Sequence, residues 1–256
     1  MIDSHCHLDF SAFDSDREQV LQTCTERGVS TFVIPGTQAN AWDNLISLCN
    51  SSGRLNFALG LHPYFLDDYC ESHLQQLDEL LTQQQGRVVA VGEIGLDFSL
   101  SIDSDLQEQV FTEQIRLAQQ HDLPIIVHHR RSHNALIRLL KEKRFVKGGI
   151  IHAFSGSYQE AQTYIDLGFK LGVGGIITYP RAKKTREVVA KVPLTSLVLE
   201  TDAPDMPINN KQGQRNSPAY LPIILQALQA LRWEPAEVVK QACWQNTFDI
   251  LVNIKT

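Results

Sequence analysis

The sequence predicts an α/β protein with a TIM-type (β/α)8 barrel, and three observations support this fold class. Eight short apolar runs alternate with amphipathic segments along the chain. Its 256 residues are a typical length for one such barrel. No linker rich in Pro, Gly or Ser divides the chain, so we expect a single domain over residues 1–256 with an extra C-terminal helix. A doubly wound open sheet is the alternative that periodicity alone leaves open.

The apolar runs are the predicted strands, and several are rich enough in β-branched residues to be buried on both faces. In chain order they are Met1–Ile2, Val29–Ile34, Leu55–Leu61, Val88–Val91, Pro124–Val127, Gly149–Ile151, Phe169–Val173 and Leu197–Leu199.

Helices are predicted between the strands from capping patterns and apolar spacing. Ser15 and Ser157 each precede a glutamate by three residues, which is the spacing of a capping box. Apolar residues recur at helical spacing over residues 106–118 and 221–231. Pro235 is predicted to start the extra helix at the carboxyl end.

Composition and charge limit the classes of function. Hydrophobic residues make up 43% of the chain, enough for a packed core, which excludes a disordered protein. No apolar run reaches the roughly 18 residues that a membrane span needs. The formal net charge of −6 disfavours a large non-specific nucleic-acid surface, but a small site that binds a few phosphates remains open. Five dispersed cysteines and an amino terminus unlike a signal peptide predict a cytoplasmic protein, which we expect to be a monomer.

Histidines and carboxylates stand at the ends of the predicted strands, where a barrel gathers its catalytic groups. The candidate ligands are His5, His7, Glu93, His128, His152 and Asp202. In an extended strand residues i and i+2 point to the same side, so His5 and His7 can reach one ion. A lone histidine at a strand end is commonly bonded to a carbonyl or to water. Packing does not explain the joint set, because charged groups are costly to bury unless they are paired or bind metal.

The number of ligands favours two divalent ions over one. The six candidates exceed the four ligands of a tetrahedral zinc, and Glu93 is long enough to bridge two metals. One ion would be held by His5, His7, Glu93 and Asp202, and the other by Glu93, His128 and His152. Zn, Mg and Mn all stay open, because imidazole favours zinc whereas magnesium prefers oxygen ligands.

In its ordered motifs the sequence resembles the TatD-type metal-dependent hydrolases, a branch of the amidohydrolase-like barrels. The matching segments span nearly the whole chain and are 3–8, 60–63, 92–97, 124–130, 152–156, 200–204, 215–218 and 246–248. The resemblance implies a TIM-type barrel, a divalent-metal site on the six residues above, and phosphodiester hydrolysis. Characterised relatives are deoxyribonucleases, some acting from DNA ends, so DNA or another phosphodiester is the expected substrate.

The chain departs from the family pattern beside the ligands. His129 stands where the family often has Ser or Thr, Ala153 where it often has Cys, and Phe98 where Tyr is usual. Residues 205–207 replace a Tyr-Leu-like continuation of the last motif. All six ligand positions are intact, so we expect a catalyst, and the departures bear on its substrate.

In the predicted mechanism Asp202 orients an activated water and accepts its proton. His62 is predicted to contact a phosphate or to protonate the leaving group, and capping the turn at residues 60–63 is its structural alternative. Arg130 is predicted to bind a phosphate through two hydrogen bonds, with a surface ion pair as the alternative. Glu200 would order the base or a neighbouring histidine.

The remaining polar candidates have structural interpretations. His73, His121 and His133 are expected at the surface, and Cys6 and His129 are expected to point away from the metals. The basic residues at 181–186 are expected either to contact a nucleic-acid backbone or to open a solvated helix.

Three functions follow from these observations. The first is a two-metal phosphodiesterase acting on DNA, as a deoxyribonuclease or exonuclease. The second is a hydrolase of small carboxylic or phosphate esters or amides, because a fold does not fix its substrate. The third is a catalytically silent module that binds metal or nucleic acid, and the intact Asp202 argues against it.

Overall fold

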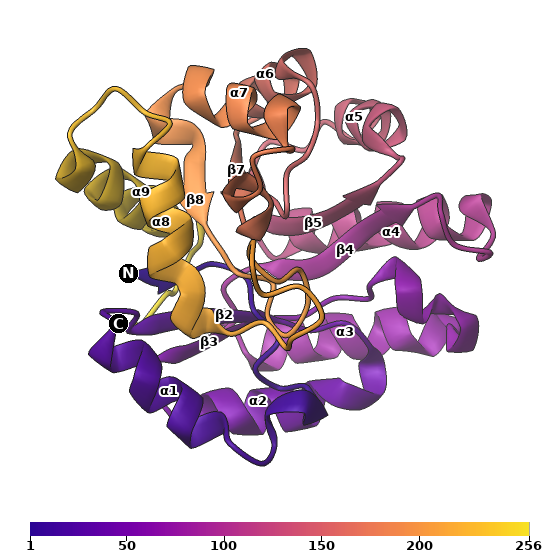
Figure 1. Cartoon of the computed structure of the whole chain (residues 1–256). Helices are drawn as coiled ribbons and strands as arrows, with labels where there is room; N and C mark the ends of the chain where they lie inside the picture. The colour runs from indigo at the N-terminus through magenta and orange to yellow at the C-terminus, as the bar shows by residue number, and fades with distance from the viewer. Residues whose placement is uncertain (256) are drawn as a thin grey trace.

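The computed structural model describes residues 1–255 and confirms the α/β prediction: parallel strands lie at the centre and helices surround them (Figure 1). The strands are β1 (Ile2–Asp3), β2 (Thr31–Pro35), β3 (Leu55–Ala58), β4 (Val91–Asp97), β5 (Ile125–Arg130), β6 (Gly149–Ile151), β7 (Phe169–Val173) and β8 (Leu197–Leu199). The α-helices are α1 (Arg17–Glu26), α2 (Trp42–Asn50), α3 (Glu71–Gln83), α4 (Ser104–Gln120), α5 (His133–Glu142), α6 (Tyr158–Asp166), α7 (Lys183–Lys191), α8 (Leu221–Gln229) and α9 (Ala236–Ile250).

The strands pair in parallel and in chain order. β1-β2-β3 form one sheet and β4 to β8 form the other. Leu59 bridges to Val91 between the two sheets, and the Ser4 amide donates a 2.9 Å hydrogen bond to the Leu199 carbonyl at the other junction. This order is that of a TIM-type barrel. The doubly wound alternative is wrong, because such a sheet reverses its strand order at a switch point.

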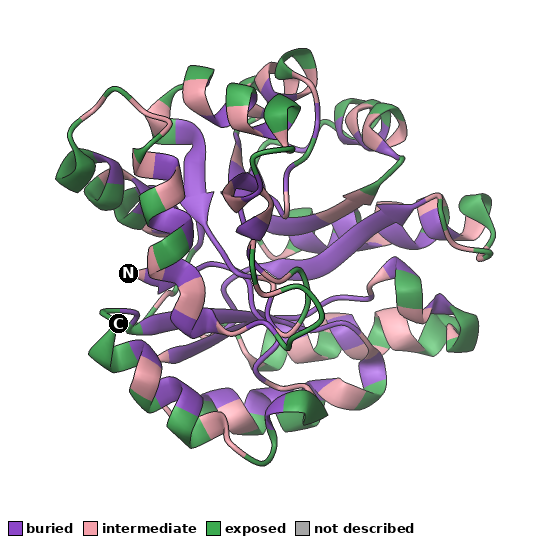
Figure 2. Cartoon of the chain, viewed as in Figure 1, coloured by how far each residue is buried: buried purple, intermediate pink, exposed green. Residues whose placement is uncertain are grey.

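Two apolar layers hold the strands. The larger lies between strands and helices, and every helix turns its buried side inward (Figure 2). The smaller consists of residues on the interior side of β2, β3, β5, β6 and β8, two residues just before β4, and Leu251 after α9. Its members are Val33, Ala58, Val89, Ala90, Ile126, Ile150, Val198 and Leu251. We call this set the interior apolar layer.

The segment after α9 covers the amino-terminal end of the barrel. The Asn253 side chain donates to the Val88 carbonyl at 3.0 Å, and the Lys255 amide donates to the Asn56 side chain at 2.8 Å. Val88 lies just before β4, and Asn56 lies near the start of β3. Because this segment covers one end of the barrel, a site is expected at the opposite end, where the carboxyl ends of the strands lie.

Two of the predicted strand limits are wrong in an informative way. β4 begins at Val91, where the predicted run ends, so Glu93 lies inside the strand instead of after it. β5 likewise continues through His128 to Arg130. Glycines and polar residues interrupt the apolar pattern here. At Gly95, with φ of 151°, a Cβ atom would lie 2.0 Å from the His128 carbonyl oxygen, so only glycine lets β4 and β5 pair.

The predicted helix starts have mixed outcomes. The capping box at Ser157 is confirmed, because its hydroxyl accepts from the Glu160 amide and the Glu160 carboxylate accepts from the Ser157 amide. The one at Ser15 is wrong: α1 begins at Arg17, and Asp16 occupies the N-cap position. Pro235 precedes α9 as its N-cap residue. In the described chain no helix is both long enough and apolar enough to cross a membrane.

Candidate metal centre

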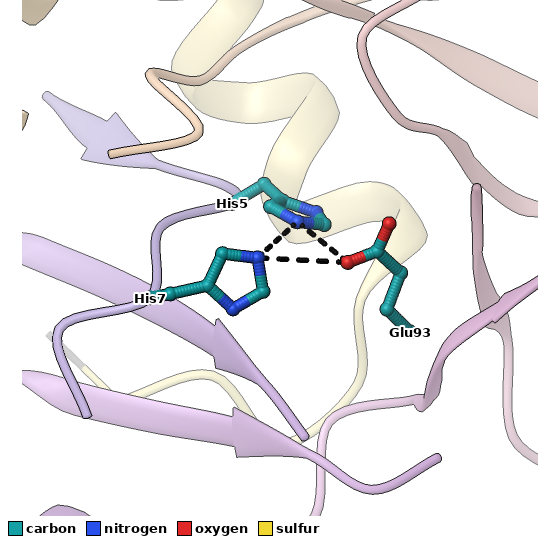
Figure 3. Close-up of side chains that lie close together, drawn as sticks. All are labelled: His5, His7 and Glu93. Atoms are coloured by element: carbon teal, nitrogen blue, oxygen red, sulfur yellow. Dashed lines mark hydrogen bonds and ion pairs between the residues drawn. The ribbon is translucent and has the colours of Figure 1, made fainter. Parts of the chain in front are cut away.

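Four of the six predicted ligands converge at the carboxyl ends of the strands. The Nε2 atoms of His5 and His7, in the segment after β1, lie 3.3 Å apart. They lie 3.1 and 3.6 Å from Oε2 of Glu93, which projects from β4 (Figure 3). Asp202 Oδ1, in the loop after β8, lies 3.6 Å from both nitrogens. Residues far apart in the sequence thus form one buried cluster, which we call the Glu93 cluster.

A bulge in β4 directs Glu93 to this point. The pairing of β4 with β5 shifts register between Val91 and Ile94, so β4 has one residue more than its partner there. Bulges re-aim a side chain that regular pleating would send elsewhere. The side chain of Glu93 is almost completely buried as a result.

The other oxygen of Glu93 faces a second group of histidines. Oε1 lies 3.1 Å from His128 Nδ1, 3.3 Å from His62 Nε2 and 3.9 Å from His152 Nε2. All six predicted ligands therefore surround this one carboxylate, and its two oxygens face different imidazole groups. His62, which was not counted among the ligands, joins them.

His62 caps the turn, as its structural alternative predicted, and its contact with a phosphate or leaving group stays a prediction. Its Nδ1 accepts a 3.0 Å hydrogen bond from the Tyr64 amide, which caps the 3₁₀ helix Pro63–Asp68. Because Nδ1 is an acceptor, the proton of the neutral ring lies on Nε2. The nitrogen that faces Glu93 is therefore a hydrogen-bond donor in the neutral ring.

Two further carboxylates stand behind the histidines. His152 Nδ1 lies 3.1 Å from Glu200, for which the sequence left open either the base or a neighbouring histidine as partner. His128 Nε2 lies 3.6 Å from Asp97, which in turn accepts from the Ser99 amide and hydroxyl. Carboxylates in such positions orient a metal-binding imidazole. Asp97 was missed, although it lies four residues after Glu93 on the same strand and so on the same face.

Buried hydrogen bonds fix the loop that carries Asp202. Asp3 is fully buried and accepts from the amide and the hydroxyl of Thr201 at 3.0 and 2.5 Å. The Asn216 side chain donates to the carbonyls of Thr201 and Asp205, both at 2.8 Å. The sequence motifs contained both residues but gave no indication of these partners.

The electrostatics of the cluster suit a cation. Burial lowers the pKa of His5 far below its ordinary value and lowers the pKa of His7 to about 4, so both rings are neutral at pH 7. Two neutral imidazoles and two carboxylates then direct lone pairs at the same small volume. Nitrogen and oxygen donors of this kind are the ligands of zinc and similar divalent ions. The residues therefore fit a divalent metal.

Two other groups of the cluster hold protons where a metal would bind. Burial raises the pKa of Asp202 to about 7. Burial by itself lowers the pKa of His152, but the nearby carboxylates of Glu200 and Asp202 outweigh it and raise that pKa to about 10. Metal binding at neutral pH must therefore displace protons.

The cluster lies at the floor of a pocket of about 640 Å³. Arg130, exposed at the end of β5, lines this pocket. Among residues 1–255 no carboxylate lies within ion-pair distance of Arg130, so the surface ion pair considered for it is not formed. The rim also carries Phe10, Tyr64 and Phe65.

The remaining candidates lie outside the Glu93 cluster. Cys6 is buried with its sulfur 3.9 Å from the Val33 carbonyl. His129 packs against the ring of His133 at 4.3 Å, although it also borders the pocket. His121 is only partly buried and pairs with Asp78 at 2.6 Å. None of the basic residues at 181–186 lines the pocket, and α7 begins among them.

A barrel with histidines and carboxylates converging at the carboxyl ends of its strands defines the class of metal-dependent hydrolases with a TIM-type fold. A family model described as TatD related DNase matches residues 2–251. The chain belongs to the TatD family of metal-dependent hydrolases.

Two relatives illustrate the range of this similarity. The chain is 45% identical over 250 residues to the uncharacterized metal-dependent hydrolase YjjV of Escherichia coli K12, covering 97% of this chain and 96% of the relative. The crystal structure of that protein superimposes with a TM-score of 0.94, covering 98% of this chain and 97% of the other. The chain is also 31% identical over 265 residues to the 3'-5' ssDNA/RNA exonuclease TatD of Escherichia fergusonii, covering 100% and 98%.

Proposed function

We propose that this hydrolase is a two-metal phosphodiesterase that removes nucleotides from the ends of DNA. The observation that carries the proposal is the division of imidazoles between the two oxygens of Glu93, because a carboxylate with donors on both sides can bridge two cations. The relative named as a ssDNA/RNA exonuclease supports nucleic acid as the substrate class.

The proposed ligand sets follow from the two sides of Glu93. One ion would be held by His5, His7, Glu93 and Asp202. The other would be held by Glu93, His128 and His152. Asp97 and Glu200 would fix the ring orientation of the second set. The identity of the ions stays open among Zn, Mg and Mn, since both imidazole and carboxylate donors are present.

The chain's own residues would divide the remaining work. Bound divalent ions would supply polarisation of the phosphoryl oxygen and a lowered pKa of water. Asp202 would accept the proton of the attacking water, from a position where Oδ1 lies 3.6 Å from the Nε2 atoms of His5 and His7. His62 would donate from Nε2 to a phosphate or leaving-group oxygen. Arg130 would bind a non-bridging oxygen from the pocket wall.

A small ester or amide is the second candidate substrate, because the pocket volume of about 640 Å³ also suits a compact molecule. A silent binding module is disfavoured by the position of Asp202 beside both His5 and His7.

We further propose a monomeric, cytoplasmic protein that acts as one unit over residues 1–256. The five cysteines are free thiols, as a reducing compartment favours.

The test is cleavage of end-labelled single- and double-stranded DNA by metal-stripped protein refilled with Mg²⁺, Mn²⁺ or Zn²⁺. We expect metal-dependent cleavage and a kcat about 10²- to 10⁴-fold lower for Asp202→Asn. Asp43→Asn, an exposed position on α2, is the matched control. Turnover of small esters with intact DNA would replace the first candidate by the second. Inactivity on every substrate, with metal bound, would support the binding module instead.

A further inference from the structure

An aromatic wall forms the β3 side of the pocket. Tyr64 and Phe65 follow His62 and Pro63, in the first turn of the 3₁₀ helix Pro63–Asp68, and their rings lie 5.0 Å apart. The Phe65 ring also lies 6.1 Å from the His62 ring, whereas Tyr64 is 61% exposed. Phe65 thus supports the site, but the packing of the fold does not account for Tyr64.

A second hollow of about 380 Å³ lies beyond this wall, and Tyr64 and Phe65 border both hollows. Its polar lining consists of the amides of Gln38 and Asn40, the acidic side chains and hydroxyl of residues 67–69, and one histidine at 73. No Lys or Arg lines it. A phosphate is disfavoured there, whereas amides and carboxylates match the hydrogen-bonding edge of a nucleobase.

The wall of the main pocket on the β5 side carries a positive charge. Arg130 is the one Lys or Arg among the described residues that line it. The charged backbone of a nucleic acid is therefore favoured on the β5 side of the Glu93 cluster, and an uncharged aromatic group is favoured on the β3 side. Every nucleobase presents a π-face that stacks on tyrosine or phenylalanine with little dependence on sequence.

We propose that Tyr64 and Phe65 form a base subsite, in which the base of the nucleotide held at the Glu93 cluster stacks on Tyr64. Its polar edge faces the second hollow, and the rest of the strand leaves past Arg130. The inference rests on the proposed phosphodiesterase function and adds the direction in which the strand crosses the pocket. A base can reach this wall only when it is unpaired, so the subsite selects single-stranded or frayed ends.

The test compares two probes that differ only in the base, dTMP and its base-free analogue 1,2-dideoxyribose 5-phosphate. Calorimetry on Mg²⁺-loaded protein gives the ratio of their Kd values, which isolates the contribution of the base. For the wild type we expect dTMP to bind at least about fivefold more tightly. Tyr64→Ala should bring the ratio close to one without weakening the base-free probe. Tyr64→Phe should keep the ratio, as should Tyr158→Ala, a 42% exposed tyrosine on α6 outside the pocket.

Equal affinity of the wild type for the two probes would overturn the subsite, as would a ratio that Tyr64→Ala leaves unchanged. Equal weakening of both probes by Tyr64→Ala would also overturn it, because that is the result of a structural role. Cleavage of single-stranded oligonucleotides by the same preparations separates the two proposals. Cleavage by a wild type that binds the two probes equally overturns only the subsite. Base-dependent binding without cleavage of any phosphodiester supports the subsite and overturns the phosphodiesterase function.

Discussion

The interior of the barrel contains two layers that lie only two residues apart on the same strands. Ile126 on β5 and Ile150 on β6 belong to the interior apolar layer. His128 and His152 follow them by two residues, point to the same side, and reach Glu93. One layer is apolar and the other consists of polar and charged side chains, although both lie on the same face of the same strands.

The difference shows how one fold separates stability from chemistry. Each fully buried Val, Ile or Leu side chain of the apolar layer contributes about 1.5–3 kcal/mol relative to an exposed one. Each buried polar group of the Glu93 cluster costs free energy unless a partner or an ion offsets it. Changes in the two layers should therefore have different signatures.

The largest effect is expected from Glu93→Gln. An amide cannot bridge two cations, so we expect loss of bound metal and a fall in hydrolytic rate on the order of 10³-fold or more. Metal analysis by mass spectrometry and kinetics on the same sample would measure both. The control is Glu79→Gln, an exposed position on α3. Full metal content and a wild-type rate would remove Glu93 from the centre of the site.

Ile126→Ala should give the reverse pattern. The cavity left in the interior apolar layer should lower the free energy of unfolding by about 2–5 kcal/mol, while the folded protein keeps its metal and its activity. Urea unfolding would measure the loss, with Ile223→Ala, 38% exposed on α8, as the control. If Ile126→Ala removed the metal without lowering stability, the two layers would not be separable.

A smaller effect is expected from Asp97→Asn. The amide oxygen can still accept from Ser99, but the charge that orients His128 is lost. Metal affinity should fall about 10- to 100-fold, as measured by competition with a chelator. Asp105→Asn, exposed in the first turn of α4, is the control. An unchanged affinity would mean that the distance of 3.6 Å between His128 and Asp97 has no role in binding.

The pH dependence of metal binding should be the most gradual effect. Without metal, His152 has a pKa of about 10 and Asp202 one of about 7, so both hold protons that an ion must displace. Both pKa values are raised, so the protons compete more strongly as pH falls, and affinity should increase with pH. We expect about a tenfold increase per pH unit for each proton released between pH 6 and 8. An affinity that is flat over this range would contradict these protonation states.

Much of the barrel could be predicted, because alternation of apolar runs and helical patterns survives in the sequence. The limits of β6, β7 and β8 agree with their apolar runs. β4 could not be delimited this way, since the face that carries Glu93 is polar and two glycines interrupt it. Apolar periodicity therefore does not predict the limits of strands whose ends bear the polar residues of the site.

The convergence of the predicted ligands could be predicted, because the carboxyl ends of all parallel strands in a barrel lie on one side. The partners of Asp3 and Asn216 could not be predicted, because they depend on distances between loops that no local pattern encodes. Asp97 was within reach, since it lies on the same strand and face as Glu93. The wall at Tyr64 depends likewise on how the 3₁₀ helix turns at the pocket rim.

The proposed ligands come from β4 and from the ends of β1, β5, β6 and β8. An ion held there acts as a cross-link between segments that are far apart in the chain, and closing such long loops stabilises the barrel as a whole. A chelator should therefore lower the melting temperature of the entire molecule instead of loosening one loop. Metal supply would then govern how long each copy of the protein survives proteolysis, as well as how fast it works.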